Sequence, residues 1–344
     1  MNFKYNNVYI NETATVTGPY ESNGPLSKYF DKSYNDLYFG TKTWELAEAK
    51  LIEDSVDILL NKLAKTKFDI DIQISGDLLN QITATNYSAS SLGIPLIGVY
   101  GACSTSVLGL IVAANMVDAK QVKNAIASTS SHNSAAEKQF RYPVEYGGPK
   151  PKTTTFTSTG GASAYLSSNK VGIKVESATI GTVVDLGVKD VYNMGAVMAP
   201  AAAKTIYSHL MANKREVGYY DLILTGDLGR YGKDILKEYM QTEYNITLSN
   251  YDDCGTIIYD LDKQPVYAGA SGPACTPLVT YSYIFDKMRK KELNRVLIVA
   301  TGALMSTTMV NEKNTIPAIA HAISLEVIEW YILILLFSVV LCVY

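Results

Sequence analysis

The sequence has few of the residues from which disulfide scaffolds and metal sites are built. Its 344 residues include four Cys and three His, and no CxxC pair occurs. Four cysteines in so long a chain favour a reducing compartment over a disulfide framework. Because the histidines at positions 132, 209 and 321 are far apart, we expect no dedicated metal site.

Charge is also scarce. Only 18% of the residues are charged, the formal net charge is −3 and no basic block occurs, which argues against nucleic-acid binding. The 47% hydrophobic content excludes intrinsic disorder. The TGGAS segment at 159–163 lacks the full spacing of a dinucleotide fingerprint, so we expect no nucleotide cofactor.

Long apolar runs are absent except at the C-terminal end. Residues 330–344 form 15 residues without a charge. As a helix this segment would be about 22 Å long, short of a bilayer core of roughly 30 Å. Two interpretations stay open: an apolar tail, 328–344, that associates with a membrane or docks on a partner, or else a buried core element or an abnormal reading-frame end.

An internal repeat organises the rest of the chain. The segment 68–78 resembles 219–228, and the glycines that they share, Gly76 and Gly226, lie 150 residues apart. An apolar-periodic helix precedes each copy, with Leu51, Val56, Leu59, Leu60 and Leu63 in the first and Ala202, Ile206, Leu210 and Met211 in the second. Four landmarks in the same order predict duplication: the segments that begin at 8 and 171, these two copies, the GA dipeptides at 101 and 269, and the strands that begin at 125 and 296.

Each repeat reads strand–helix–strand–helix–strand, which is typical of mostly parallel sheets covered by helices. Two such halves, 1–168 and 169–327, predict an α/β fold with α/β/α/β/α layers and pseudo-twofold symmetry. The second half has 18 extra residues between its markers, which we interpret as a strand pair at 256–259 and 266–268.

The most specific local signal surrounds Cys103. An apolar strand over 94–100 leads through Gly101 and Ala102 into Cys103 and a helix, as in a nucleophile elbow. The positive end of the helix dipole would favour a thiolate there, and free N–H groups would bind an anion. The alternative is that Cys103 is a small buried hydrophobe.

Other polar residues are placed where ligands gather in α/β folds. His132 follows an apolar strand, and we expect it to meet Cys103 beyond the strand ends. Asp77 and Asp227 follow the matched glycines, and helix capping is the favoured interpretation over a catalytic or metal-binding pair. Arg141 and Lys150 lie in an irregular loop that is either a cationic lid or a solvated connection.

The duplicated half with GA-Cys at its first elbow resembles the thiolase-like superfamily of condensing enzymes. Over residues 8–326 the chain more closely resembles the stage V sporulation protein AD family of spore-forming bacteria. The residues that carry this resemblance are the segments GPL at 24, FDKSY at 30, GDLLNQ at 76, GACSTS at 101, TSSHN at 129, QFRYP at 139, MAPAAA at 198, LTGDL at 224 and IPAIAH at 316.

This resemblance implies a non-catalytic subunit of a spore membrane complex that takes up dipicolinic acid, as the free acid or its calcium chelate. It implies a peripheral position at the cytosolic face of the inner spore membrane, aided by residues 330–344, together with other stage V sporulation membrane subunits. A homodimer is expected from the superfamily. The alternative is a thiolase-like acyltransferase with Cys103 as nucleophile.

For the site, the resemblance places Cys103 at the nucleophile position of the superfamily. The second half offers Asp227 and no His or Asn where condensing enzymes carry them, which favours binding over catalysis. A flat aromatic dianion needs N–H groups, hydroxyls or cations beside an apolar surface. We therefore expect the ligand to contact Cys103, Ser104, Thr105, His132, Asp227 and Arg141.

Overall fold

The computed structural model describes residues 1–328, and the predicted 328–344 tail lies outside this range except for its first residue. The strands are β1 (Asn2–Lys4), β2 (Tyr9–Thr17), β3 (Lys32–Ser33), β4 (Gln73–Gly76), β5 (Leu96–Gly98), β6 (Asn124–Ser131), β7 (Phe156–Thr157), β8 (Gly160–Ser167), β9 (Ile173–Ile180), β10 (Leu222–Thr225), β11 (Tyr251–Asp253), β12 (Ala270–Ser271), β13 (Arg295–Ala303) and β14 (Ala318–Val327).

The helices vary from single turns to 20 residues. They are α1 (Pro19–Ser22), α2 (Trp44–Lys62), α3 (Thr83–Leu92), α4 (Thr105–Asp118), α5 (Asn133–Phe140), α6 (Met194–Asn213), α7 (Gly229–Tyr244), α8 (Cys254–Ile257), α9 (Cys275–Val279), α10 (Phe285–Arg289) and α11 (Thr307–Asn311). Within residues 1–328, no helix is both long and apolar enough to cross a membrane.

The strand order repeats between the two halves. The sheet runs β11-β10-β13-β14-β9-β2-β8-β6-β4-β5, so each half contributes five strands in a mirrored sequence. The halves meet where β2 pairs with β9, with Tyr9 opposite Lys174 and Ile10 opposite Ile173. The predicted duplication is therefore present in the strand order as a pseudo-twofold relation.

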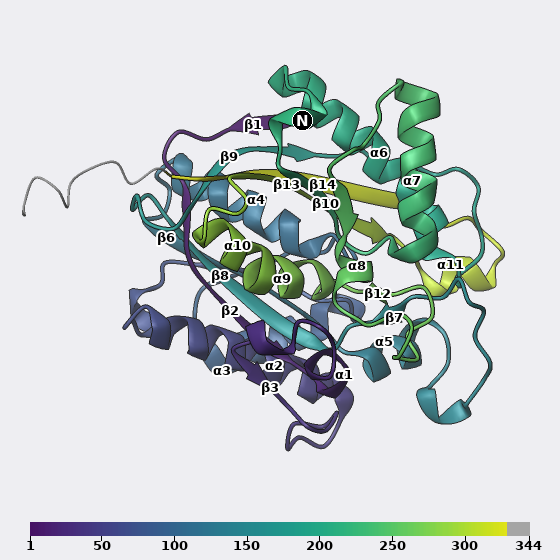
Figure 1. The fold of residues 1–344 in the computed structure, drawn as a ribbon. Coiled ribbons are helices and arrows are strands. Elements are labelled where there is room, and N and C mark those ends of the chain that lie inside the picture. Colours follow the sequence, from purple (N-terminus) through teal and green to yellow (C-terminus); the bar gives the residue numbers. More distant parts are fainter. Residues whose placement is uncertain (329–344) are drawn as a thin grey trace, which may run out of the picture.

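The layers follow from the helices that cover each half-sheet. Helix α2 packs on β2 and β8, α6 packs on β13 and β14, and α4 with α9 and α10 lies between the half-sheets (Figure 1). This arrangement is the predicted α/β/α/β/α fold. The second-repeat helix predicted from apolar spacing buries Ala202, Ile206 and Leu210, whereas Met211 is exposed, contrary to the expected apolar face.

The expectation of mostly parallel sheets is wrong. Parallel pairs join β4 to β5 and β6, and β10 to β11 and β13, but β6–β8 and β13–β14 are antiparallel. The reason is that α5 and α11 are short and stay at the strand ends. The next strand therefore begins at the same edge and runs back, with Ser131 opposite Gly160 and Ala303 opposite Ala318.

The strand pair predicted at 256–259 and 266–268 is also wrong. Residues 254–257 form α8, and the later segment contributes only an isolated bridge between Thr155 and Tyr267. Short apolar runs do not distinguish a buried helical turn from a strand, which is why periodicity failed here.

A buried carboxyl connects the halves beside α1. Glu21 is fully buried, and its Oε1 accepts hydrogen bonds from the Thr159 N–H at 2.9 Å and from the Tyr259 hydroxyl. Its Oε2 has no hydrogen-bond partner. Burial raises the pKa of Glu21 to about 7, which the hydrogen bonds only partly offset.

This raised pKa predicts a pH-dependent stability that the Glu21→Gln variant loses. The stabilising contribution of the protonated carboxyl is complete below about pH 4.5 and is lost as the pH rises through about 7. Relative to wild type, Glu21→Gln should gain up to about 3 kcal/mol in unfolding free energy between pH 4.5 and 8. Urea unfolding at several pH values measures this gain, with Glu312→Gln at an exposed position as the control. A difference that does not change with pH would contradict the assignment.

Candidate functional site

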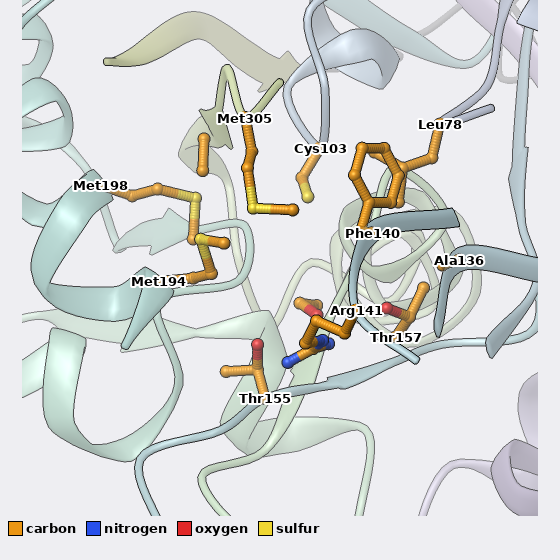
Figure 2. Close-up of a pocket in the computed structure, with 12 residues that line it drawn as sticks. Leu78, Cys103, Ala136, Phe140, Arg141, Thr155, Thr157, Met194, Met198 and Met305 are labelled. Carbon is orange, nitrogen blue, oxygen red and sulfur yellow. The ribbon is translucent and has the colours of Figure 1, made fainter. Parts of the chain in front are cut away.

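A pocket opens between the two halves beyond the ends of the central strands. The space between its walls, including the side open to solvent, is about 520 Å³, and both halves supply these walls (Figure 2). Its position beyond the carboxyl ends of strands is the one expected for a ligand site in an α/β fold. The lining residues are Leu78, Cys103, Ala136, Phe140, Arg141, Thr155, Thr157, Met194, Met198, Ser271, Ala303 and Met305.

Cys103 reaches this pocket from a tight turn before α4. Ala102 has a positive φ of 50°, which turns the chain sharply between β5 and the helix. The Cys103 side chain is partly exposed and points into the pocket (Figure 2). The predicted strand–turn–helix around Cys103 is thus confirmed, and the thiol is accessible.

Ser104 and Thr105 do not reach the pocket, contrary to the sequence prediction. The Ser104 hydroxyl donates to the Gly101 carbonyl and the Thr105 hydroxyl to the Ala102 carbonyl, both at 2.6 Å. Their N–H groups donate to the same two carbonyls, at 3.0 and 3.2 Å. Since the turn itself uses these donors, the expected anion-binding N–H groups are not free.

Asp227 lies beside Cys103 and is fully buried. Its Oδ1 accepts from the Thr301 hydroxyl at 2.5 Å, and its Oδ2 accepts from the Gly272 N–H at 3.2 Å. The Cys103 thiol is close enough to this carboxylate for the two groups to shift each other's pKa. Burial, with a smaller contribution from the nearby Asp253, raises the pKa of Asp227 to about 7. Asp227 does not line the pocket, so it positions Cys103 from behind.

This environment disfavours the thiolate. Burial and the adjacent Asp227 charge raise the pKa of the Cys103 thiol well above its usual range. The sequence predicted the opposite, on the ground of the helix dipole. The dipole effect is modest and the nearest helical N–H groups are already bonded, so desolvation and the neighbouring carboxylate dominate.

The capping prediction holds for one aspartate of the matched pair. Asp77 accepts from the Leu79 N–H at 2.8 Å and from the Thr85 N–H at 2.7 Å, at the start of α3. In the second half, Asp253 has the capping role, because it accepts from the N–H groups of residues 228 and 229, each at 2.9 Å. Asp227 is thereby available for Cys103.

His132 is the cap of α5 and does not meet Cys103. Its Nδ1 accepts from the Ser134 N–H at 3.2 Å, its Nε2 lies 2.8 Å from the Leu37 carbonyl oxygen, and its ring packs against Phe39. Burial lowers the pKa of His132 to about 4, so the ring is neutral at physiological pH. The predicted contribution of positive charge to a ligand is therefore wrong.

Arg141 is the predicted residue that best fits an anion site. Its Nη2 pairs with the buried Glu137 at 2.6 Å, and its side chain is only 10% exposed. Its Nη1 is buried without a hydrogen-bond partner. In Figure 2 the guanidinium lies at the base of the pocket near Thr155. Arg141 is therefore part of the pocket wall, whereas residues 142–147 of the loop that follows are exposed.

Sequence reasoning missed the apolar walls. Phe140, Met194, Met198 and Met305 come from three separate segments, and only the fold brings them together. The hydroxyls of Thr155, Thr157 and Ser271 were also missed. The motif QFRYP at 139–143 carried the available signal, since it contains both Phe140 and Arg141.

The fold and this site define a thiolase-like protein. A 3-oxoacyl-[acyl-carrier-protein] synthase III from Aquifex aeolicus superposes with a TM-score of 0.54 at 10% identity, covering 93% of this chain and 97% of that chain. A variant of OleA from Xanthomonas campestris gives 0.58 at 14% identity, covering 93% and 99%. These likenesses establish the fold.

The sequence comparisons identify a narrower group of proteins than the fold does. The model of the stage V sporulation protein AD family matches residues 1–326. The stage V sporulation protein AD of Bacillus subtilis strain 168 is 48% identical over 319 residues, which cover 93% of this chain and 94% of that protein. The chain therefore belongs to the stage V sporulation protein AD family.

The Cys103–Asp227 contact leads to a testable expectation for thiol reactivity. Replacing Asp227 by Asn removes the adjacent negative charge, so the rate of Cys103 alkylation by iodoacetamide at pH 8 should rise about tenfold. Peptide mass spectrometry resolves Cys103 from the other cysteines. The matched control is Asp77→Asn in the other half, which should leave the rate unchanged, and equal rates in wild type and Asp227→Asn would contradict the contact.

Proposed function

We propose that this chain binds dipicolinic acid as a non-catalytic subunit of a spore membrane complex that takes up this compound during sporulation. The observation that carries the proposal is Arg141, which lines the pocket and whose buried Nη1 has no hydrogen-bond partner. An unpaired buried donor is costly, and a ligand carboxylate would supply the missing acceptor.

The walls of the pocket suit the aromatic ring of such a ligand. Phe140 and the three methionines at 194, 198 and 305 offer flat or adaptable apolar surface to an aromatic ring. The hydroxyls of Thr155 and Ser271 add polar contacts. Among residues 1–328 no cluster of acidic, His or Cys side chains is suited to a metal, so calcium would arrive as part of the ligand chelate.

Membership of the family supports the proposed setting. We assign the chain to the cytosolic face of the inner spore membrane, where it acts with other stage V sporulation membrane subunits. Residues 330–344 would aid this attachment, and a homodimer is the expected assembly. Fractionation of spore membranes with and without these residues tests the attachment.

Calorimetric titration with dipicolinate, with and without calcium, tests the binding proposal. Arg141→Met should weaken binding about 10- to 100-fold, since a charge-assisted hydrogen bond is lost, while Arg141→Lys should retain part of the affinity. His132→Ala should affect thermal stability and leave binding nearly unchanged. Arg289→Met, at an exposed arginine on α10, is the control. Absence of binding by folded wild-type protein would overturn the proposal.

A separate experiment tests the proposal that the chain is not a catalyst. None of the three histidines lines the pocket, and the raised pKa keeps Cys103 a thiol at neutral pH. Incubation with acetyl-CoA or lauroyl-CoA should therefore leave the intact mass of the protein unchanged. An acyl adduct on Cys103, absent in Cys103→Ala, would instead establish a thiolase-like acyltransferase.

A further inference from the structure

A second concave surface lies next to the pocket, and we call it the outer groove. It is formed mainly by the loop after α5 and contains about 1010 Å³ of empty space including its open side. Four tyrosines dominate its surface. The lining residues are Glu137, Arg141, Tyr142, Pro143, Val144, Tyr146, Gly147, Gly148, Pro149, Lys150, Tyr192 and Tyr267.

The tyrosines are unusually accessible for aromatic side chains. Tyr142 is 58% exposed, Tyr146 71% and Tyr267 43%. The rings of Tyr142 and Tyr146 stack with centroids 5.3 Å apart, and the Tyr192 ring lies under the Arg141 guanidinium at 5.8 Å. Exposed aromatic clusters of this kind mark binding surfaces, and stacked rings suit a flat ligand.

Tyr267 supports this interpretation from the second half. Its backbone φ is +57°, a conformation that is rare for a bulky side chain. Such a conformation persists only where the surroundings hold it, as the backbone bridge between Thr155 and Tyr267 does here. At this position the Tyr267 ring lies in the lining of the groove. A glycine would adopt the same backbone conformation but would contribute no aromatic surface.

The charge of the groove favours an anion. Arg141 and Lys150 both pair with the single carboxylate of Glu137, at 2.6 and 2.9 Å. The lining therefore carries two cations and one carboxylate. Glu145 and Lys152 on the same loop lie outside the lining and balance each other.

Arg141 lines both the pocket and the outer groove. We propose that the outer groove is a second binding site for flat aromatic carboxylates, with Arg141 as the residue common to both sites. In the outer groove, a ligand carboxylate would lie beside Lys150, and the ligand's aromatic ring would stack on the exposed face of Tyr142 or Tyr146. A ligand in the pocket would contact the same Arg141 side chain. This proposal rests on the proposed function for the identity of the inner site, but its groove has its own contacts.

Two-site titration with dipicolinate on the full chain separates the two proposals. Wild type should show a tight and a weaker phase. Tyr142→Ser combined with Tyr146→Ser should weaken the second phase about tenfold and leave the first. Ala303→Phe, which fills the pocket, should remove the first phase and keep the second. Tyr87→Ser, at a tyrosine 61% exposed on α3, is the matched control and should change neither.

The outcomes are distinct. One phase that Ala303→Phe abolishes and the tyrosine variant leaves intact would overturn the outer groove and retain the pocket. A single phase that the tyrosine variant weakens and Ala303→Phe leaves intact would support the groove and overturn the assignment of the pocket. Hexanoate, an aliphatic carboxylate, should bind the groove at least tenfold more weakly than dipicolinate, and equal binding would overturn the aromatic specificity. Circular dichroism of each variant shows that it remains folded.

Discussion

The antiparallel contact between β2 and β9 is the constraint on which the rest of the structure depends. Each half-sheet has one open edge at its centre, and an unpaired edge strand is a liability. Pairing of Tyr9 and Ile10 with Lys174 and Ile173 joins the two edges, and β1 covers residues 177–179 of β9 beyond this contact. The joined strands relate the two halves about a pseudo-twofold axis. Because the central helices α4, α9 and α10 fill the space between the half-sheets, the strand ends of both halves open toward one pocket.

The two halves differ from each other at the candidate site. In the first half the aspartate after the matched glycine caps a helix, as Asp77 does for α3. In the second half Asp253 has taken over the cap, which leaves Asp227 free to turn toward Cys103. A duplicated fold can reassign a residue in one copy without loss of stability when another side chain satisfies the same N–H groups.

Local patterns predicted the parts of the fold and the site that depend on neighbours in sequence. The repeat, the layered architecture and the turn before Cys103 could be predicted because glycine spacing and apolar periodicity encode them. The roles of Ser104 and His132 could not, since both depend on which carbonyls and N–H groups tertiary contacts leave unsatisfied. Phe140 and the methionines of the pocket wall come from three segments, and no short sequence motif predicts that these segments meet.

The surroundings of Arg141 and Cys103 are the physical basis for proposing binding over catalysis. An enzyme of this fold would need a thiolate at Cys103, but Asp227 and burial hold the proton on sulfur. The same low-dielectric surroundings increase the value of a correctly placed cation. Glu137 occupies one side of the guanidinium and fixes its orientation, while Nη1 stays unpaired in the pocket. In the proposed role, a Cys103 that keeps its proton and a guanidinium with one unpaired nitrogen would favour binding of an anion over acyl transfer.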